Sequence, residues 1–171
     1  AETALANPKG RSISILARAC PLCNENGEVT GAIESIRDIT ESKKTEYSLR
    51  SSEEKFRALV ELSLEGIIIT DFSGTLLFAN HTAGTIVDMD DIQKVLATKN
   101  VIDFVAPESQ ADVLRDITQV SQGIDAYLVS YKLITAKQRE VWVECIGKKI
   151  QYENAPAMLV SMRDITERKR A

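Results

Sequence analysis

The chain has 171 residues, of which 44% are apolar and 27% are charged, a composition typical of a folded globular protein. Its net charge of −4 argues against a nucleic-acid partner, because binding phosphates requires clustered Lys and Arg. No apolar run approaches the roughly 20 residues that a membrane-spanning helix needs. The 3 cysteines, an odd number, fit a reducing compartment better than a disulfide framework. We therefore expect a cytoplasmic protein without a membrane segment and, since the sequence ends inside a charged run, a part of a longer protein.

The first predicted element is a β-hairpin. Ile13, Ile15 and Ala17 alternate with other residues, and turn residues at 24–27 precede a second apolar run at 29–39. A helix is predicted over 41–63, because this segment contains no Gly or Pro and is rich in strong helix formers. Ser51 and Glu54 form a capping-box pattern, so a restart or kink of the helix there is an open alternative.

The elements that follow predict a second, complete unit. A β-branched strand at 66–71, a turn at 72–74 and a strand at 75–79 come first, and short helices follow to about residue 96. Pro107 suits the first turn of a helix with one apolar face, formed by Val113, Leu114, Ile117 and Val120. Three longer strands are predicted at about 126–135, 139–150 and 157–165. This order predicts an α+β fold, a five-stranded antiparallel sheet with short helices on one face.

One heptapeptide occurs twice. Ser-Ile-Arg-Asp-Ile-Thr-Glu at 35–41 returns as Ser-Met-Arg-Asp-Ile-Thr-Glu at 161–167, so that Asp38 and Asp164 lie 126 positions apart (164 minus 38). That spacing is within the normal size of one small domain. We therefore predict that 1–40 are the last two strands of a truncated upstream copy, that 41–63 are a linker helix, that 53–166 are a complete copy, and that 167–171 begin an outgoing helix.

Seven short stretches in the complete copy follow one another in a recognisable order. They lie at 56–61, 65–67, 71–74, 78–80, 103–108, 141–144 and 163–169, and span about 115 residues, one domain's worth. Together they resemble the PAS family, most sharply in the ending Asp-Ile-Thr-Glu-Arg-Lys at 164–169. The resemblance implies a tandem PAS region of a prokaryotic sensor histidine kinase. It also implies a signal junction where each copy hands over to a helix, formed by Asp38, Thr40, Asp164 and Thr166.

Each junction and turn residue also has a local role. Gly74 allows the positive φ of a tight turn, and Asp71 can accept hydrogen bonds from turn amides. Asn80 can cap the helix after the second strand, and Asp164 or Thr166 can cap the outgoing helix.

The inner face of the sheet is the predicted ligand pocket. Strand alternation places Ile68, Thr70, Leu76 and Phe78 on one face, which the family pattern makes the inner one. The pocket as predicted is mostly apolar with scattered hydroxyls, and it lacks the Arg, Lys or His cluster of a carboxylate-binding site. Its predicted residues are Ile68, Thr70, Leu76, Phe78, Val113, Leu114, Ile117, Ser130 and Ser161. A closed core without a ligand is the alternative.

Cofactor and metal sites receive little support. Cys20 and Cys23 have the CxxC spacing of redox and zinc sites, but they precede a hairpin turn and not the helix N-terminus that a redox-active cysteine needs. A structural zinc site needs four ligands, and besides these two cysteines the sequence offers only Cys145 and His81. Haem-binding members of the family usually carry the ligand on the longer helix, which here contains no His, and none of the cysteines stands in the motif of the photoactive flavin-binding members. We predict no metal and assign no cofactor.

The sequence thus predicts a non-catalytic sensory or relay module. It contains no Gly-rich phosphate loop, so a kinase activity would belong to other parts of the parent protein. The partners expected are adjoining PAS or kinase domains and a second copy of the chain, a homodimer through the linker helix and the sheet, although heptad spacing in that helix is weak. The alternatives are a haem- or flavin-bound redox or gas sensor and a dimerisation scaffold without a ligand.

Overall fold

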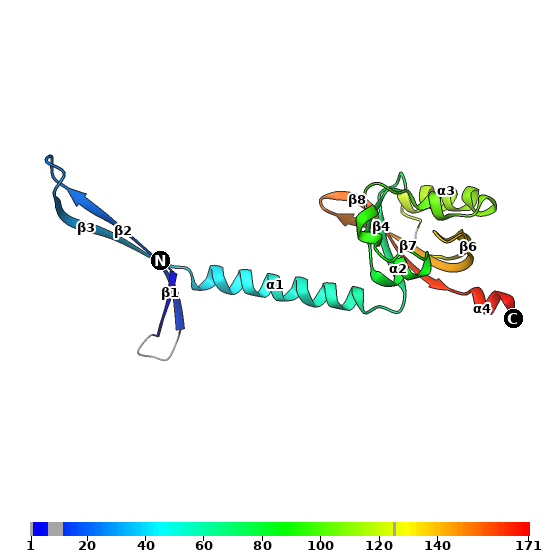
Figure 1. The fold of residues 1–171 in the computed structure, drawn as a ribbon, viewed down its shortest axis with the longest axis horizontal. Coiled ribbons are helices and arrows are strands. Elements are labelled where there is room, and N and C mark those ends of the chain that lie inside the picture. Colours follow the sequence, from blue (N-terminus) through cyan, green and yellow to red (C-terminus); the bar gives the residue numbers. More distant parts are fainter. Residues whose placement is uncertain (1, 7–11, 125) are drawn as a thin grey trace. The chain divides into compact units, whose positions relative to one another are not determined.

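The computed structural model describes residues 2–6, 12–124 and 126–171, which form two compact units, Ala1–Phe56 and Arg57–Ala171 (Figure 1). None of the helices in these ranges is long and apolar enough to cross a membrane.

The first unit is a three-stranded antiparallel sheet in the order β1-β2-β3, formed by β1 (Glu2–Ala6), β2 (Ser12–Cys23) and β3 (Val29–Asp38). The predicted hairpin is confirmed in β2 and β3, and Asn24 closes its turn by accepting hydrogen bonds from the amides of Asn26 and Glu28. Only two strands are predicted here from the sequence, because 2–6 has no clear strand pattern. The third strand, β1, forms by pairing with the first half of β2. Pro21 lies beyond the part of β2 that β1 covers, where its missing N–H breaks no ladder.

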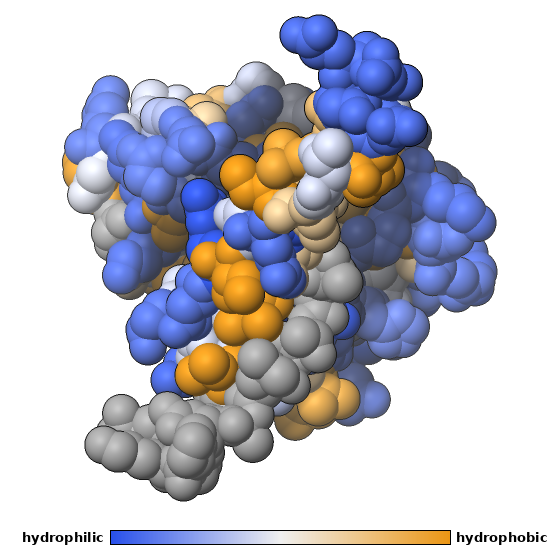
Figure 2. All heavy atoms as spheres, turned by 90° about the vertical axis from the view of Figure 1, so that its left-hand side faces the viewer, coloured by the Kyte–Doolittle hydropathy of each residue, from blue (hydrophilic) through white to orange (hydrophobic). Residues whose placement is uncertain are grey.

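Apolar side chains are exposed on this sheet. Four apolar side chains of β2 and β3 have from 49% to 69% of their surface exposed: Leu22, Val29, Ile33 and Ile36. Apolar side chains also gather on the face of the molecule that Figure 2 presents. The sheet therefore leaves an apolar surface without cover from the described residues of its own unit.

Helix α1 (Thr40–Glu61) follows and runs without interruption. Of the two alternatives left open at Ser51, the structure has the continuous helix. Instead of capping a restart, the Glu54 carboxylate accepts a hydrogen bond from Arg50 Nε at 3.0 Å in an i, i+4 ion pair. No side chain of α1 is buried.

The second unit is built on a five-stranded sheet in the order β5-β4-β8-β7-β6, in which all neighbouring strands are antiparallel. The predicted fold class is confirmed. The elements in chain order are β4 (Gly66–Thr70), β5 (Leu76–Ala79), α2 (His81–Ile86), the 3₁₀ helices η1 (Ile92–Val95) and η2 (Val101–Phe104), α3 (Pro107–Ser121), β6 (Leu128–Ile134), β7 (Glu140–Tyr152), β8 (Ala155–Asp164) and α4 (Thr166–Arg170). The helices α2 and α3 lie on one face of the sheet (Figure 1), and the core lies beneath them.

The turn between β4 and β5 follows the sequence prediction. Asp71 Oδ1 accepts hydrogen bonds from the amides of Ser73 (2.9 Å) and Thr75 (2.8 Å), and Gly74 has a φ of 87°. Burial has the largest single effect on the pKa of the Asp71 carboxyl and raises it, but the hydrogen bonds from Ser73 and Thr75 together outweigh burial and lower the pKa.

Asn80 connects four segments of the second unit from a fully buried position. Its Oδ1 accepts from the amides of Ile67 and Ala83, both at 2.9 Å, and so caps α2 as predicted. Its Nδ2 donates to the carbonyls of Val60 in the last turn of α1 (2.9 Å) and of Glu65 just before β4 (3.0 Å). One carboxamide thus satisfies two donors and two acceptors that would otherwise be buried without partners.

Replacing Asn80 by Ala should therefore destabilise the second unit by about 3 kcal/mol or more, since each buried group left unpaired costs about 1–3 kcal/mol. Chemical denaturation followed by Trp142 fluorescence measures the change. The matched control is Gln151→Ala at an exposed position of the same unit, where we expect a change within about 0.5 kcal/mol. An N80A protein as stable as the wild type would show that these contacts contribute nothing.

Candidate functional site: an apolar cavity and a helix junction

A cavity of about 110 Å³ lies between the inner face of the five-stranded sheet and the helices that cover it. All five strands contribute to its wall, together with α2, α3 and both 3₁₀ helices. Most of the wall is aliphatic. The polar side chains that it contains are those of Thr70, Asp116, Tyr127, Tyr131 and Cys145.

Five of the nine predicted pocket residues line this cavity: Ile68, Thr70, Leu76, Val113 and Ile117. They come from β4, β5 and α3, which lie apart in the sequence and meet in the core. Whether they bind a ligand stays a prediction.

The other four predicted residues do not line it. Phe78 lies opposite Ile69, whereas Leu76 lies opposite Thr70, so Leu77 is the extra residue of a β-bulge that turns Phe78 to the other face. Leu114 is 53% exposed on the outer side of α3.

Ser130 and Ser161 point away from the cavity for a different reason. On β6 the wall is formed by Val129, Tyr131 and Leu133, so the exposed Ser130 has the opposite phase. On β8 the residues of the wall are Met158, Val160 and Met162, and the Ser161 hydroxyl donates instead to the Glu65 carboxylate. Both strands carry apolar residues in both phases, so sequence alternation alone does not select the inner one.

Thr70 is the unusual residue of the wall. It is fully buried, and its Oγ1 has no hydrogen-bond partner among the described residues. Its neighbours across the sheet are Leu76 on β5 and Met158 on β8, whose side chains offer it no strong acceptor. A buried hydroxyl without a hydrogen bond lowers the stability of the folded protein, whereas an apolar side chain of the same size would not.

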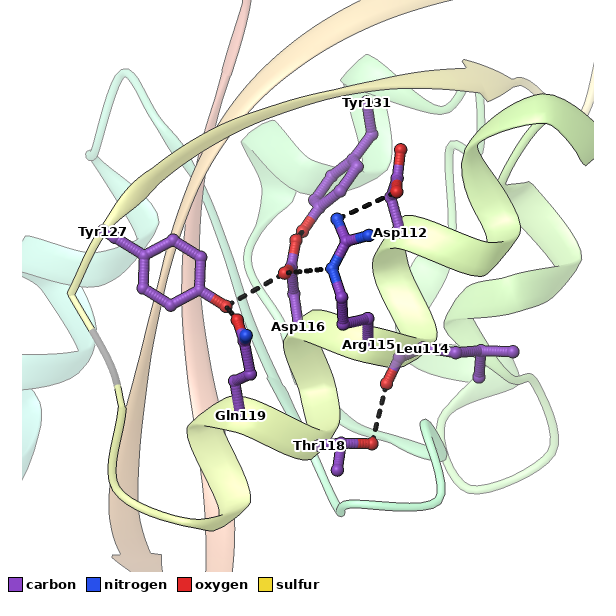
Figure 3. A network of polar contacts seen from close by, with 8 residues as sticks. All are labelled: Asp112, Leu114, Arg115, Asp116, Thr118, Gln119, Tyr127 and Tyr131. Carbon is purple, nitrogen blue, oxygen red and sulfur yellow. Dashed lines mark hydrogen bonds and ion pairs between the residues drawn. The ribbon is translucent and has the colours of Figure 1, made fainter.

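A polar network from α3 and the region of β6 lies at another part of the wall (Figure 3). The buried Asp116 accepts hydrogen bonds from both phenols, Tyr127 to Oδ1 at 3.0 Å and Tyr131 to Oδ2 at 2.5 Å. Gln119 Oε1 lies 2.8 Å from the same Tyr127 hydroxyl and is an alternative acceptor for its single proton. Arg115 Nε lies 3.8 Å from Asp116 Oδ1. Burial, and then the hydrogen bond to Asp116, raises the pKa of both phenols, most strongly that of Tyr131.

Asp116, Tyr127 and Tyr131 are not among the predicted site residues. The signal was present, because Asp116 occupies an apolar helical face between Val113 and Val120, where a carboxylate needs partners. The two tyrosines that supply them are 11 and 15 positions further along the chain, and no local pattern connects them to α3.

The remaining candidates lie in different places. Cys145 is in the cavity wall, where burial raises the pKa of its thiol to about 12, so that the thiol stays protonated and weakly nucleophilic at neutral pH. Cys20 and Cys23 are exposed on β2 in the other unit. His81 is exposed at the start of α2, and its amide donates to Glu61.

The repeated Asp-Ile-Thr motif forms the same set of hydrogen bonds in both units, which we call the clasp. In the second unit, Asp164 Oδ1 accepts from the Thr166 amide at 2.8 Å, and Thr166 Oγ1 accepts from the Trp142 amide on β7 at 3.0 Å. The amide of Ile165 donates to the Trp142 carbonyl at 2.8 Å. The start of α4 is thereby fixed to β7.

The first unit repeats this arrangement with Ser14 of β2 in the place of Trp142. Thr40 donates its amide to Asp38 Oδ1 and accepts from the Ser14 amide, both at 2.9 Å, and the Ile39 amide donates to the Ser14 carbonyl at 2.8 Å. Hydrogen bonding by Thr40 lowers the pKa of the exposed Asp38 carboxyl. The start of α1 is thus fixed to β2 in the same way as α4 is fixed to β7. The structure brings each predicted junction pair together.

Comparison with known proteins agrees with this geometry. A family model described as the PAS domain matches residues 1–41 and 64–167. The PAS domain of an HTR-like protein from Haloarcula marismortui has the same fold, with a TM-score of 0.60 and 21% identity over 72% of this chain and 99% of that one. The chain is also 23% identical to sporulation kinase A of Bacillus subtilis over 161 residues, and 27% identical to sporulation kinase E of the same organism over 135 residues.

The chain belongs to the PAS domain family, a family of sensory domains. The alignment with sporulation kinase A includes 94% of this chain but only 26% of that kinase, and the alignment with sporulation kinase E includes 79% of this chain but only 18% of that kinase. The chain therefore resembles the sensory part of such proteins.

Thr70→Val should stabilise the protein by about 1 kcal/mol, because it removes a buried hydroxyl that has no partner. Thr135→Val is the matched control. Thr135 is equally buried, but its Oγ1 accepts from the Arg139 amide at 3.0 Å, so its loss should destabilise by about 1–3 kcal/mol. Denaturant unfolding of both variants measures the difference, and a destabilised T70V protein would show that the hydroxyl has a partner within the fold.

Tyr131 should stay protonated in the folded protein at about pH 11, where an ordinary tyrosine, with a pKa near 10, is ionised. Ionised tyrosines absorb near 295 nm, so the native wild type and the native Tyr131→Phe variant should show the same absorbance there at about pH 11. After denaturation the variant should lose about a quarter of the signal, since the chain has 4 tyrosines. The pKa of Tyr131 is higher in the folded than in the unfolded protein. The protonated phenol therefore contributes fully to the stability of the fold below about pH 10, and this contribution is lost as the pH rises further. A lower native signal for Y131F would contradict the raised pKa.

Proposed function

We propose that this chain is a relay module of a longer histidine kinase, in which the state of the cavity biases the helix that follows Thr166. The observation that supports the proposal best is the clasp, because it holds that helix on a strand of the cavity wall. On β7, Val143 lines the cavity, and the backbone of the preceding residue, Trp142, holds Ile165 and Thr166. A ligand that moves β7 would thus move the attachment point of α4.

Two further contacts reinforce this attachment. Arg168 Nη2 lies 2.5 Å from Glu144 Oε1 on β7, and Lys169 Nζ lies 5.1 Å from the centre of the Trp142 ring. Exposed ion pairs contribute little on their own, so the clasp is the main restraint and these contacts set the direction of the first turn.

We further propose that the module works as a homodimer through α1 and the outer surface of the sheet, beside adjoining PAS or kinase domains of the same chain. Leu49, Phe56 and Leu59 follow heptad spacing along α1 and are 61%, 70% and 72% exposed. Leu128 and Ile146 are exposed on β6 and β7. Such apolar surface is the kind that a partner covers. Since phosphoryl transfer from ATP takes place inside the cell, the setting that we propose is cytoplasmic.

Within this proposal, residues 1–40 are the end of an upstream copy, 53–166 are the complete PAS domain, and the helix between them transmits between the two. The recurrence of the clasp supports this division. A haem- or flavin-bound sensor is the competing function, and the absorption spectrum of freshly purified protein separates the two: a Soret or flavin band would favour it.

Thr166→Val should weaken the relay. The variant leaves the Trp142 amide without an acceptor, and a change of about 1 kcal/mol in a two-state junction shifts its equilibrium about fivefold. We expect faster hydrogen exchange in α4 of the isolated chain and a changed autophosphorylation rate in the longer protein. Thr166→Ser, which keeps the hydroxyl, is the control that should behave as wild type. Unchanged exchange and unchanged output in T166V would refute the coupling.

A further inference from the structure

The size of the cavity restricts what it can hold. A cavity of roughly 150 Å³ lined by Leu, Ile and Phe accommodates benzene. The cavity described above measures about 110 Å³ and has a similar aliphatic wall. As it stands, it therefore favours a compact ligand with about six non-hydrogen atoms over one as large as a flavin.

The charges of the wall restrict the ligand further. Among the described residues of the wall there is no Lys, Arg or His, so an anion would be desolvated without a cation and would face the Asp116 carboxylate. A cation would meet a carboxylate whose two oxygens already accept from Tyr127 and Tyr131. An uncharged ligand has a smaller desolvation free energy on entering this cavity than an anion or a cation.

One polar atom of the wall stays available for a ligand. The Thr70 hydroxyl is buried, lies among aliphatic neighbours and lacks a partner in the described part of the chain. A hydroxyl donates one hydrogen bond and accepts others, so it can pair with an alcohol, a phenol or a carbonyl group. Because both possible protein neighbours across the sheet are apolar, the partner that satisfies it would come from the cavity.

From these three restrictions we infer the ligand class: an uncharged, mainly apolar molecule of about the size of benzene, with one hydrogen-bonding group that pairs with Thr70 Oγ1. This inference rests on the proposed function, since it names the ligand of the same cavity. Thr70 is then the residue that confers specificity, the aliphatic wall provides the affinity, and Asp116 with its two tyrosines excludes anions.

Binding of three probes of similar shape to the 171-residue chain tests the inference: toluene, phenol and benzoate, titrated at neutral pH and followed by the NMR signals of the Met158 and Met162 methyl groups. The wild type should bind phenol and toluene but not benzoate. In Thr70→Val the dissociation constant for phenol should rise about five- to tenfold relative to that for toluene, the loss expected for one hydrogen bond. Thr70→Ser, which keeps the hydroxyl, should preserve the preference for phenol.

Three results would overturn the inference. If phenol and toluene lose affinity equally in T70V, Thr70 is not the polar anchor. If benzoate binds as well as phenol, the argument from charge is wrong. If none of the probes shifts the methionine signals while the unfolding curve shows an intact fold, the cavity does not take this class of ligand.

These outcomes are separate from the test of the relay. Probe binding is measured on the isolated chain and does not depend on output, whereas the Thr166 variants test the junction without any ligand. Phenol binding that depends on Thr70, together with an unchanged output of T166V, would support the ligand class and refute the relay. The opposite pattern would support the relay and refute the ligand class.

Discussion

The hydrogen bonds of Asn80 are the constraint on which the second unit depends. A chain that passes from a helix to a strand, through a hairpin and into another helix leaves backbone groups without partners at each change of direction. Asn80 meets four of these groups from one buried position, in α1, before β4, within β4 and in α2. The place where the chain enters the domain, the first strand of the sheet and the first helix over the cavity are thereby fixed relative to one another.

The exit of the domain is fixed to the sheet as well. The clasp joins the start of α4 to β7, and Glu65, just before β4, accepts hydrogen bonds from Ser161 and Arg163 on β8. These bonds lower the pKa of the Glu65 carboxyl, the one from Ser161 most and that from Arg163 next. Entry and exit are thus attached to adjacent strands, and the other face of the same strands lines the cavity. In the proposed relay, a change in the cavity would therefore have a short route to both ends.

The sequence predicts most of this fold because its signals are local. Gly74 and Asp71 define a turn, Asn80 a cap, and the two Asp-Ile-Thr motifs a repeat whose junction geometry recurs between the units. The cavity wall is harder to predict. The bulge at Leu77 reverses the orientation of Phe78, and β6 and β8 are apolar in both phases, so the inner face is decided by packing against α3 and not by alternation. The contact of Asp116 with Tyr127 and Tyr131 depends on how the chain folds back onto α3, which no local pattern contains.

The recurrence of the clasp gives α1 a special position in the chain. Its first residue, Thr40, is held by β2 of the first unit through the Ser14 amide, and its last turn is held by Asn80 of the second unit through the Val60 carbonyl. The helix between these attachments has 22 residues and is therefore about 33 Å long, since an α-helix rises about 1.5 Å per residue. An uninterrupted helix transmits a rotation or shift of one end to the other more faithfully than a flexible linker, which would absorb it. Because α4 leaves the second unit from the same kind of clasp, a displacement that enters at Thr40 and a ligand that occupies the cavity would act on the same outgoing helix. Under the proposed relay, an upstream signal and a local one would therefore converge on α4.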